Sequence, residues 1–573
     1  MTDIEYGPKT PLAIELDEMK YRLKGETFKE SRTRVANALK DSDEHYHDFR
    51  DSLLGQYFLP GGRVLSAVGA PREVTPFNCF VSMTIEDSMD SIMDAAKYAA
   101  TTMRLGGGIG YDFSNIRPRG TNIVTLDSRA SGPVSFMGIF DAICKTISSA
   151  GHRRGAQMGC LRVDHPDIEE FISCKSDNTT LTQFNLSVLV TDEFMKAVDN
   201  NSMFQLRFEG RVYKQVRARY LWEKIMRQTW DYAEPGVIFV DRINRKNNLW
   251  YCETISATNP CGEQPLAPHA ACLLGSMNLT KFVKVNHDGK RYFDYEDFKR
   301  RIPAIVRAMD NINDIAIYPL PEQKESAQSK RRMGLGVTGL ANAGEGIGLQ
   351  YGRDEFMLWA REVFTIYRDE CYRQSIELAK EKGPFPLFDA DLYLQSEFAQ
   401  TLPEDIRSDI ARYGIRNSHL LSIAPTGTIS NVADNVSSGI EPPFSLYYDR
   451  VVQTFDGPKT ERVSDYAYRE WGVEGVTALE IDVQDHVDVL CLASEFVDSA
   501  CSKTINVGND VTWEQFQAVY VSAYEGGASG CTTFRAAGKR AGILTAAASE
   551  DVAEPAEGGS CVYDPVTGIK SCE

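Results

Sequence analysis

Short apolar runs alternate with helical segments along most of this chain, and this alternation is the feature that most constrains its fold. It extends over roughly 450 residues and shows no repeat of fixed period. The predicted strands cover residues 75–83, 109–113, 184–190, 237–240, 420–424 and 530–535. The predicted helices cover residues 87–105, 166–174, 193–200, 220–232, 296–316, 353–382 and a segment that ends near Glu525. This order indicates an α/β fold with a mostly parallel sheet or barrel.

The two ends of the chain differ from this α/β body. Residues 12–59 have the periodicity of helices, and the glycines at 61 and 62 end that pattern. From residue 545 the composition changes to Ala, Ser, Glu, Pro and Gly, which is typical of a disordered linker. We therefore predict a helical region at 1–62, the α/β body at 63–544 and a flexible tail at 545–573.

Charge and cysteine content narrow the class of protein. A net charge of −18 argues against a nucleic-acid-binding surface, since such domains are usually basic. We find neither a secretory signal nor an apolar run long enough for a membrane span. Thirteen cysteines in such a chain indicate the reducing cytoplasm, where free thiols are the default. The eight histidines are scattered outside any zinc-binding pattern, so a zinc or iron–sulfur site is not expected.

A loop rich in polar residues and proline stands near the middle of the chain. Its sequence, Asn-Pro-Cys-Gly-Glu-Gln-Pro-Leu, places an amide, a thiol and a carboxylate at alternate positions, Asn259, Cys261 and Glu263. In an extended loop, residues two apart point the same way, so all three could face one small molecule. The alternative is an ordinary turn in which the cysteine is a buried, small apolar residue.

Two more segments carry candidate chemistry. The turn after the predicted strand 420–424 is rich in glycine and hydroxyl groups and precedes a helix, so its backbone N–H groups could cradle phosphate, or it could be a plain helix cap. Its residues are Pro425, Thr426, Gly427, Thr428, Ile429 and Ser430. In the tail, Cys561 and Cys572 have no core to fill. They are either a chance pair of exposed thiols or a mobile dithiol that carries reducing equivalents.

Taken together, these segments resemble the catalytic subunit of a ribonucleotide reductase. The resemblance spans roughly residues 60–573 and follows the family's order of motifs. The matching segments are Phe77-Asn78-Cys79, Asp87-Ser88-Met89-Asp90-Ser91-Ile92, Gly108-Ile109-Gly110, Ile116-Arg117, Asn259-Pro260-Cys261-Gly262-Glu263, Ala271-Cys272, Ala424-Pro425-Thr426-Gly427-Thr428, Gly439-Ile440-Glu441-Pro442 and the tail dithiol. Each segment alone is weak evidence, whereas the ordered set is specific.

The resemblance implies a ten-stranded α/β barrel, made of two five-stranded parallel halves that run antiparallel to each other. A central finger loop would carry Cys261 as the radical cysteine at its tip. Cys79 and Cys272 would face each other from neighbouring strands as the reducing pair. A non-catalytic nucleotide-binding regulator would not need these cysteines, and a simple redox dithiol protein would not need this α/β body.

The implied activity is reduction of ribonucleotides to 2′-deoxyribonucleotides for DNA synthesis. Cys261 would take the 3′-hydrogen, Glu263 would accept the 3′-hydroxyl proton, and Asn259 would hold the sugar hydroxyls. Cys79 and Cys272 would protonate the leaving 2′-hydroxyl and supply two electrons. Asn78 and the 425–430 turn would bind the substrate. The Cys561/Cys572 dithiol would then reduce the barrel disulfide, and a thioredoxin- or glutaredoxin-like partner would reduce the tail.

Regulation is also implied by the resemblance. Asp87 and Ser88 would bind the ribose of a dNTP or ATP specificity effector at a homodimer interface, and Arg117 would approach its phosphates. The polar loop at 176–183 would relay the effector's identity to the base pocket. The N-terminal region is too short for the family's ATP-binding cone, so on/off control by dATP is not expected. The chain also lacks room for the insertion of monomeric cobalamin enzymes, which favours a homodimer acting on diphosphates, with triphosphates as the alternative.

The source of the radical divides this family. The glycyl-radical type needs a C-terminal glycyl motif that the tail lacks, and the type with a separate di-metal subunit needs two adjacent tyrosines on the strand at 530–535. That strand reads Gly-Cys-Thr-Thr-Phe-Arg, which favours adenosylcobalamin as the cofactor. A partner di-metal subunit is the alternative. One departure is that ten residues separate Cys561 from Cys572, where a Cys-x-x-Cys pair is usual.

Overall fold

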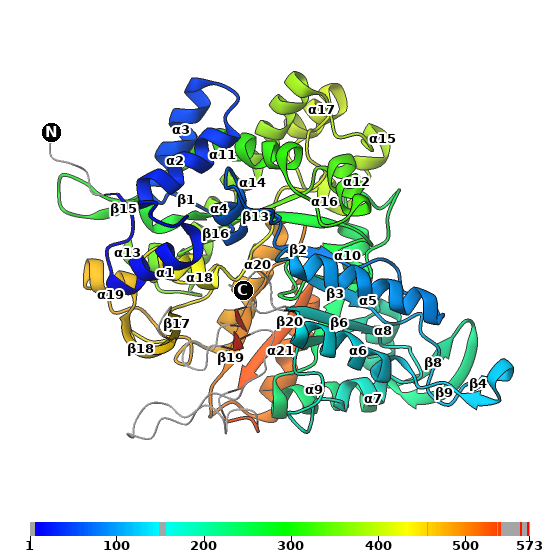
Figure 1. The fold of residues 1–573 in the computed structure, drawn as a ribbon. Helices are drawn as coiled ribbons and strands as arrows, with labels where there is room; N and C mark the ends of the chain where they lie inside the picture. The colour runs from blue at the N-terminus through cyan, green and yellow to red at the C-terminus, as the bar shows by residue number, and fades with distance from the viewer. Residues whose placement is uncertain are drawn as a thin grey trace.

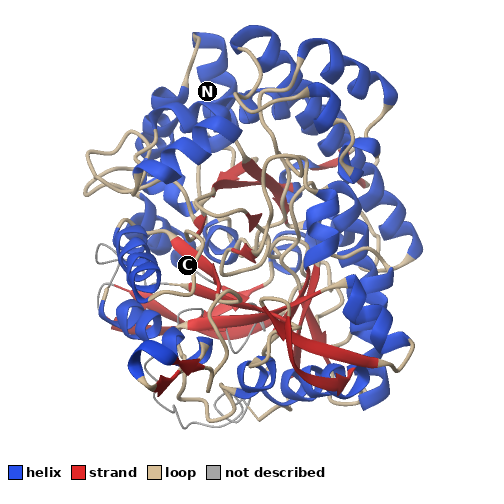
Figure 2. Ribbon diagram, turned by 90° about the vertical axis from the view of Figure 1, so that its right-hand side faces the viewer, coloured by secondary structure: helices blue, strands red, loops and turns tan. Residues whose placement is uncertain are grey.

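The computed structural model describes residues 6–147, 156–454, 457–535, 537–539, 562–563 and 570–571. A ten-stranded sheet runs through its centre, and helices surround this sheet (Figure 1, Figure 2). Among the described helices, none is both long enough and apolar enough to cross a membrane.

Five parallel strands form the first half of the sheet. In sheet order they are β2 (Cys79–Val81), β3 (Gly108–Asp112), β6 (Gln157–Arg162), β7 (Phe184–Val190) and β10 (Gly236–Phe239). The helices between them are α5 (Met89–Arg104), α6 (Pro133–Thr146), α7 (Ile168–Ser173), α8 (Asp192–Asp199) and α9 (Ala218–Tyr232). Most of these elements lie close to their predicted positions, because capping residues and buried apolar runs define them locally, whereas α6 and β6 are not among the predicted ranges. Ser88, for example, caps α5 by accepting a hydrogen bond from the Ser91 N–H at 3.2 Å.

The second half is built from two parallel strand pairs with a bridging segment between them. The pairs are β13 (Ala271–Asn278) with β16 (Met333–Thr338), and β19 (Thr504–Val507) with β20 (Gly530–Arg535). Isolated parallel bridges join Leu335 to Leu421 and Ile423 to Cys501. The two halves meet through antiparallel pairs, β2 with β13 and β10 with β20. The mixed α/β class with a large, mostly parallel sheet is confirmed, and closure of the sheet into a barrel stays a prediction.

The bridging segment is where the strand prediction for 420–424 is wrong. The segment forms only isolated bridges instead of a continuous strand. The N–H groups of Leu420 and Leu421 donate to the buried Asp498 carboxylate at 2.7 and 2.9 Å. The Asp498 carboxylate, from a distant part of the chain, therefore accepts the hydrogen bonds of two backbone N–H groups that a continuous strand would give to its neighbour.

The N-terminal region contains the expected helices, but its end differs from the prediction. The helices are α1 (Pro11–Tyr21), α2 (Phe28–Leu39) and α3 (Asp43–Leu54). A short strand, β1 (Phe58–Pro60), follows and pairs antiparallel with β13, and a further helix, α4 (Gly62–Ala67), begins at the second glycine. Gly61 is needed for this close approach, because a Cβ there would lie 2.9 Å from the Leu274 carbonyl oxygen. The glycine pair thus joins a strand to a helix instead of ending a helical region.

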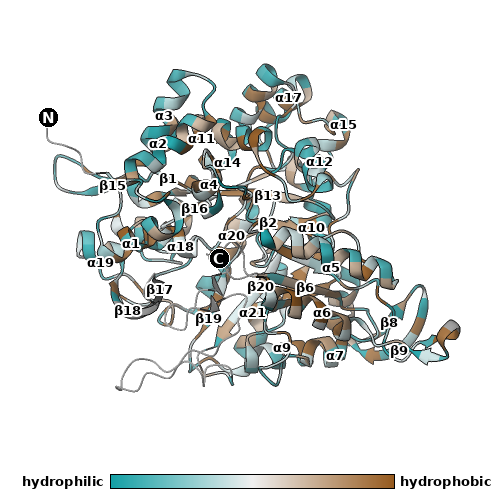
Figure 3. Cartoon of the chain, in the orientation of Figure 1, coloured by the Kyte–Doolittle hydropathy of each residue, from teal (hydrophilic) through white to brown (hydrophobic). Residues whose placement is uncertain are grey.

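The remaining helices and hairpins complete the described part of the chain. The helices are α10 (Val240–Lys246), α11 (Tyr295–Ile315), α12 (Pro321–Lys330), α13 (Leu340–Gly346), α14 (Asp354–Lys382), α15 (Ala390–Tyr393), α16 (Glu397–Gln400), α17 (Glu404–Tyr413), α18 (Gly427–Val432), α19 (Tyr466–Trp471), α20 (Val483–Phe496) and α21 (Trp513–Glu525), with 3₁₀ turns at Val124–Leu126 and Leu279–Phe282. The two-stranded pairs are β4 (Asn122–Ile123) with β5 (Ser128–Arg129), β8 (Met203–Phe208) with β9 (Arg211–Arg217), β14 (Val283–Val285) with β15 (Arg291–Phe293), β17 (Tyr447–Thr454) with β18 (Gly457–Ser464), and β21 (Val562–Tyr563) with β22 (Lys570–Ser571). Hydropathy follows this arrangement, since outer helices such as α2 and α12 are largely hydrophilic while α6 and β6 are apolar (Figure 3).

A hairpin that we call the finger hairpin, residues 257–266, contacts both halves of the sheet. Its strands, β11 (Ala257–Thr258) and β12 (Pro265–Leu266), pair antiparallel. On the first half, Asn185 of β7 donates its Nδ2 hydrogen to the Pro260 carbonyl oxygen at 2.9 Å. On the other side, Ser422 Oγ donates to the Glu263 carbonyl oxygen at 2.9 Å. The predicted polar loop is therefore an inserted hairpin held from two sides.

The insertion requires glycine at position 110. A Cβ at Gly110 would lie 1.8 Å from the Thr258 carbonyl oxygen, a distance that no side chain can occupy. The Gly108-Ile109-Gly110 motif thus has a structural reason, which is clearance for the finger hairpin.

We expect Gly110→Ala to displace the finger hairpin, lower the melting temperature and remove activity. The matched control is Gly138→Ala on α6, where an added Cβ meets no atom within 4 Å. That change should be neutral or stabilising by about 0.5–1 kcal/mol, because alanine favours a helix over glycine. Thermal unfolding and a turnover assay of both variants test this, and an active, undestabilised Gly110→Ala protein would contradict it.

Candidate active site

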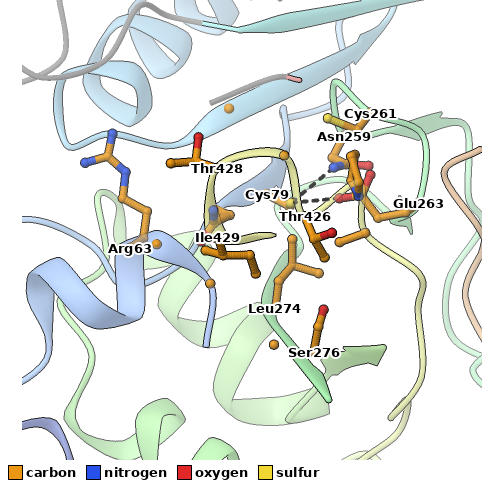
Figure 4. Close-up of a pocket in the computed structure, with 18 of the residues that line it drawn as sticks. Arg63, Cys79, Asn259, Cys261, Glu263, Leu274, Ser276, Thr426, Thr428 and Ile429 are labelled. Atoms are coloured by element: carbon orange, nitrogen blue, oxygen red, sulfur yellow. Dashed lines mark hydrogen bonds between the residues drawn. The ribbon is translucent and has the colours of Figure 1, made fainter. Parts of the chain in front are cut away.

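The tip of the finger hairpin lines a pocket in which the predicted residues come together. Asn259, Cys261 and Glu263 all line this pocket, as expected from their alternate positions (Figure 4). Asn259 and Glu263 are each 1% exposed, whereas Cys261 at the tip is half-buried. The pocket's other walls include Cys79, Asn78 and residues 424–429.

Hydrogen bonds connect the finger hairpin to the thiol of β2. Asn259 Nδ2 donates to Cys79 Sγ at 3.1 Å, and Cys79 Sγ lies 3.8 Å from Glu263 Oε1, which can accept its hydrogen. The Gln264 N–H donates to Asn259 Oδ1 at 2.9 Å and fixes the amide's orientation. An amide, a thiol and a carboxylate are therefore oriented around one small volume.

Cys79 and Cys272 are direct neighbours across the antiparallel pair of β2 and β13. Cys272 is fully buried and Cys79 is 3% exposed. Burial raises the pKa of both thiols well above the ordinary value, and the Glu263 carboxylate raises that of Cys79 further. Both thiols consequently carry their protons at neutral pH and could deliver them.

The turn expected to bind phosphate forms another wall of the pocket. Pro425, Thr426, Gly427, Thr428 and Ile429 line it. The Thr428 hydroxyl is buried without a hydrogen-bond partner among the described residues, which leaves it able to bind a ligand. Ser430 does not line the pocket, because its hydroxyl bonds to Ser438 Oγ at 3.0 Å and to the Gly427 carbonyl oxygen at 3.1 Å.

Thr426 has a left-handed backbone, with φ of 55°, that neighbouring groups hold in place. Its Oγ1 accepts from the Gly439 N–H at 2.7 Å and shares a hydrogen bond with Thr338 Oγ1 at 2.9 Å. These contacts connect the turn to β16 and to the Gly439-Ile440-Glu441-Pro442 motif.

Comparison with known proteins identifies the family. The model of the ribonucleotide reductase barrel domain matches residues 77–470 and 475–534. The chain belongs to the ribonucleotide reductase family. It is 34% identical to a vitamin B12-dependent ribonucleoside-diphosphate reductase of Thermoplasma acidophilum over 91% of this chain and 69% of that protein. A reductase of the same name from Mycobacterium tuberculosis is 34% identical over 92% of this chain and 76% of its own length. A ribonucleoside-diphosphate reductase subunit alpha of Chlamydia pneumoniae matches less well, at 26% identity over 64% of this chain and 40% of its own.

Arg63 is a pocket residue of this reductase that the sequence did not single out. It lies on α4 and lines the pocket on the side of Thr428 (Figure 4). Lys20 and Tyr21 of α1 also line the pocket. Asn78 lines it as predicted, and its Oδ1 is buried without a hydrogen-bond partner among the described residues. A basic residue directly after the glycine pair at 61–62 was the available signal for Arg63.

The residues predicted for the effector site also lie together, but they bond to one another. Arg117 Nε donates to Asp87 Oδ2 at 2.6 Å, and the Arg117 N–H donates to Asp87 Oδ1 at 3.1 Å. Ser88 is exposed and uses its hydroxyl to cap α5. A nucleotide at this place would therefore have to compete with an existing ion pair.

The tail dithiol, Cys561 and Cys572, lies outside the described residues. The short strand β22, Lys570–Ser571, lies beside α18, which carries part of the predicted phosphate turn.

The structure also describes a second, smaller cavity on the other side of the finger hairpin. Cys261 lines both cavities, and the second one is also lined by Ser502 and Thr532. Among the described residues, no cluster of His, Cys, Asp or Glu is arranged to hold a metal ion.

We expect Cys79 and Cys272 to resist alkylation, because the thiolate is the reactive form and burial raises the pKa of both. Cys252, an exposed cysteine, is the internal control and should react faster than either, since burial raises its pKa less than it raises theirs. Labelling with iodoacetamide between pH 7 and 9, followed by mass spectrometry of the peptides, measures the order. Labelling of Cys79 at the rate of Cys252 at pH 7 would contradict it.

Proposed function

We propose that this ribonucleotide reductase converts ribonucleoside diphosphates to 2′-deoxyribonucleotides by thiyl-radical chemistry, with adenosylcobalamin as the source of the radical. The observation that carries the proposal is the arrangement of Cys261, Asn259 and Glu263 on one pocket, with Cys79 hydrogen-bonded beside them. The relatives named as B12-dependent diphosphate reductases support the cofactor and the substrate class.

In this proposal each residue has a separate role. Cys261, once oxidised, takes the 3′-hydrogen of the ribose and later returns it, while the Glu263 carboxylate accepts the 3′-hydroxyl proton. The Asn259 amide holds the sugar hydroxyls. Cys79, protonated because it is buried, gives its proton to the leaving 2′-hydroxyl, which departs as water. Cys79 and Cys272 then supply two electrons and become a disulfide, as their cross-strand positions permit.

Substrate binding is assigned to the opposite wall of the pocket. The turn at 425–429 and Thr428 in particular would hold the phosphates, with the side chain of Arg63 as the nearby positive charge. Asn78, with its buried and unpartnered Oδ1, would bind a hydroxyl or base edge. Ser430 is assigned a supporting role in the turn, since its hydroxyl is used within the protein.

The second cavity supports the cofactor assignment by its position beside Cys261, although it has room for only a part of a molecule as large as adenosylcobalamin. Because Cys261 lines both cavities, a group bound there could reach its sulfur without displacing substrate. Hydroxyl groups of Ser502 and Thr532 would be available to hold it. When bound, adenosylcobalamin supplies a carbon radical that oxidises the Cys261 thiol. A separate di-metal subunit would instead need a tyrosine pair on β20, which carries Thr533 and Phe534 at its end.

Three further assignments extend this proposal. The first concerns the sheet: the isolated bridges at Leu421 and Ile423 support its closure into the ten-stranded barrel, with the N-terminal helices outside it.

The second concerns the oligomer. The exposed Met89 and Met93 on α5 lie beside the partly buried apolar face of α6 and support a homodimer. The dNTP or ATP effector site would lie near Asp87, Ser88 and Arg117.

The third concerns the tail. The position of β22 beside α18 supports a tail whose cysteines reduce the barrel disulfide. A thioredoxin- or glutaredoxin-like dithiol would then reduce the tail cysteines.

We expect the purified chain to form deoxynucleotide with adenosylcobalamin and dithiothreitol and to form none without the cofactor. Cys261→Ser should abolish turnover while substrate binding is retained, because only the radical hydrogen transfer needs this thiol. Cys252→Ser, at an exposed position outside the pocket, is the control and should stay active. Activity that appears only with a second protein would overturn the cofactor assignment, and turnover by Cys261→Ser would overturn the radical assignment.

We expect Thr428→Val to weaken substrate binding, because it removes a hydroxyl proposed to bond a charged phosphate. Such a hydrogen bond contributes roughly 1.5–3 kcal/mol, which corresponds to tenfold or more in affinity. Thr428→Ser keeps the hydroxyl and is the matched control. Equilibrium binding of a nucleoside diphosphate measures the change, and equal affinity for both variants would contradict the phosphate assignment.

A further inference from the structure

A buried arginine continues the line of the two cysteines across the sheet. Cys272 pairs with Cys79 on β2, and on its other side the ladder of β13 and β16 pairs Leu273 with Met333. Arg332 directly precedes β16, so extending this parallel register by one residue puts it opposite Cys272. Residues opposite each other in a sheet share a face, which agrees with the electrostatic effect of Arg332 on Cys272.

Arg332 is unusual for a residue at this depth. It is 2% exposed, its Nε donates to His419 Nδ1 at 3.2 Å, and one of its terminal nitrogens donates to Glu253 Oε1. The other terminal nitrogen is buried and has no hydrogen-bond partner among the described residues. Lys330 Nζ lies 2.8 Å from the second oxygen of Glu253.

The cluster around Arg332 contains charged groups of both signs. Burial lowers the pKa of His419 well below its ordinary value, so this ring is neutral. Although burial opposes it, the cations of Arg332 and Lys330 hold the pKa of Glu253 at about 2, so this carboxylate is charged. Arg332 and Lys330 thus share the Glu253 carboxylate, and the buried Asp498 carboxylate, whose pKa burial raises to about 6, is a further group that Arg332 acts on. A buried cation with one terminal nitrogen left without a hydrogen-bond partner among the described residues costs stability, which argues for a role beyond packing.

The two cysteines differ in their surroundings. Cys79 lines the substrate pocket and has Glu263 as the nearest charged group, whereas Cys272 is fully buried and does not line that pocket. Burial raises the pKa of Cys272, and the carboxylates of Glu263 and Asp498 raise it further. Arg332 is the charged group that lowers it. Cys79 is therefore the sulfur that a reductant in the pocket can reach, and Cys272 is the sulfur that the Arg332 cation acts on.

We propose that Arg332 sets the direction in which a Cys79–Cys272 disulfide is reduced, by making Cys272 the leaving sulfur. This inference rests on the proposed role of the two cysteines as the reducing pair. Arg332 acts through Cys272 and is a positioning residue, since it does not line the substrate pocket.

The exchange balances with a dithiol as the reductant. A thiolate of the dithiol arrives through the pocket and attacks Cys79 Sγ, a new S–S bond forms there, and the Cys79–Cys272 bond breaks. Cys272 leaves as a thiolate beside the Arg332 cation and later takes a proton. The second thiolate of the dithiol then displaces Cys79, so that the dithiol is oxidised and both barrel cysteines are reduced. Exchange is faster when the leaving thiol has the lower pKa, which is the effect assigned to Arg332.

The sulfur that is attacked can be identified directly. The oxidised full-length protein is treated with the monothiol 2-mercaptoethanol, quenched in acid, alkylated with N-ethylmaleimide and analysed by mass spectrometry. We expect the mercaptoethanol adduct on Cys79 and the maleimide on Cys272. An adduct mainly on Cys272 overturns this inference alone. Absence of a Cys79–Cys272 disulfide after one turnover overturns the proposed function, and this inference with it.

The role of the arginine is tested with matched variants. Arg332→Gln should slow reduction of the disulfide by dithiothreitol about tenfold and spread the adduct over both cysteines. Arg332→Lys keeps the charge and should restore the preference for Cys79. Glu253→Gln is the control, since it removes a contact of Arg332 but leaves the cation.

If Arg332→Gln fails to fold because Glu253 is left as a buried unpaired charge, the double variant Arg332→Gln/Glu253→Gln removes both charges. A variant without the cation that forms the disulfide and reduces it at the normal rate, with the normal adduct position, overturns the inference.

Discussion

The insertion of the finger hairpin is the constraint on which the rest of the site depends. A hairpin can lie against both halves of the sheet only where the surrounding backbone leaves room, and at Gly110 the room is the absence of a Cβ. Its tip is then held by Asn185 from one side and by Ser422 and the Ala500 N–H from the other. These contacts place Cys261 between two cavities, so that one sulfur can be reached from two directions.

Burial is the second physical effect that organises the site. It keeps Cys79 and Cys272 protonated, which suits the role proposed for them, in which they deliver protons before they deliver electrons. The same burial would hinder their later reduction, because a leaving thiolate is a charge in a poorly solvated place. In the role that we propose for Arg332, its cation offsets that cost at Cys272 only. Burial thus favours the proposed oxidation of the two thiols to a disulfide, and the proposed role of Arg332 is to assist the reduction of that disulfide back to thiols.

Local signals predicted most of the elements that surround the site. The strand β7 and the end of α21 agree with the sequence analysis because a buried apolar run and a glycine stop define them without help from distant residues. The predictions were wrong where distant residues decide. Asp498 takes backbone donors from residues 420 and 421, and pairing with β13 makes a strand of residues 58–60. The β8–β9 hairpin was not predicted, since its outer strand is mostly exposed and lacks an apolar pattern.

The sequence by itself determined the types and the order of the residues for which we propose the chemistry. Cys79, Asn259, Cys261, Glu263 and Cys272 were predicted from that order, and the structure brings them together at the pocket and at the β2–β13 pair. Only the tertiary structure decided what stands beside them. Arg63 lines the pocket, Ser430 uses its hydroxyl within the protein, and Arg332 acts on the pKa of Cys272 from across the chain. These neighbours depend on strand register and on contacts between residues far apart in the chain, which no local pattern encodes.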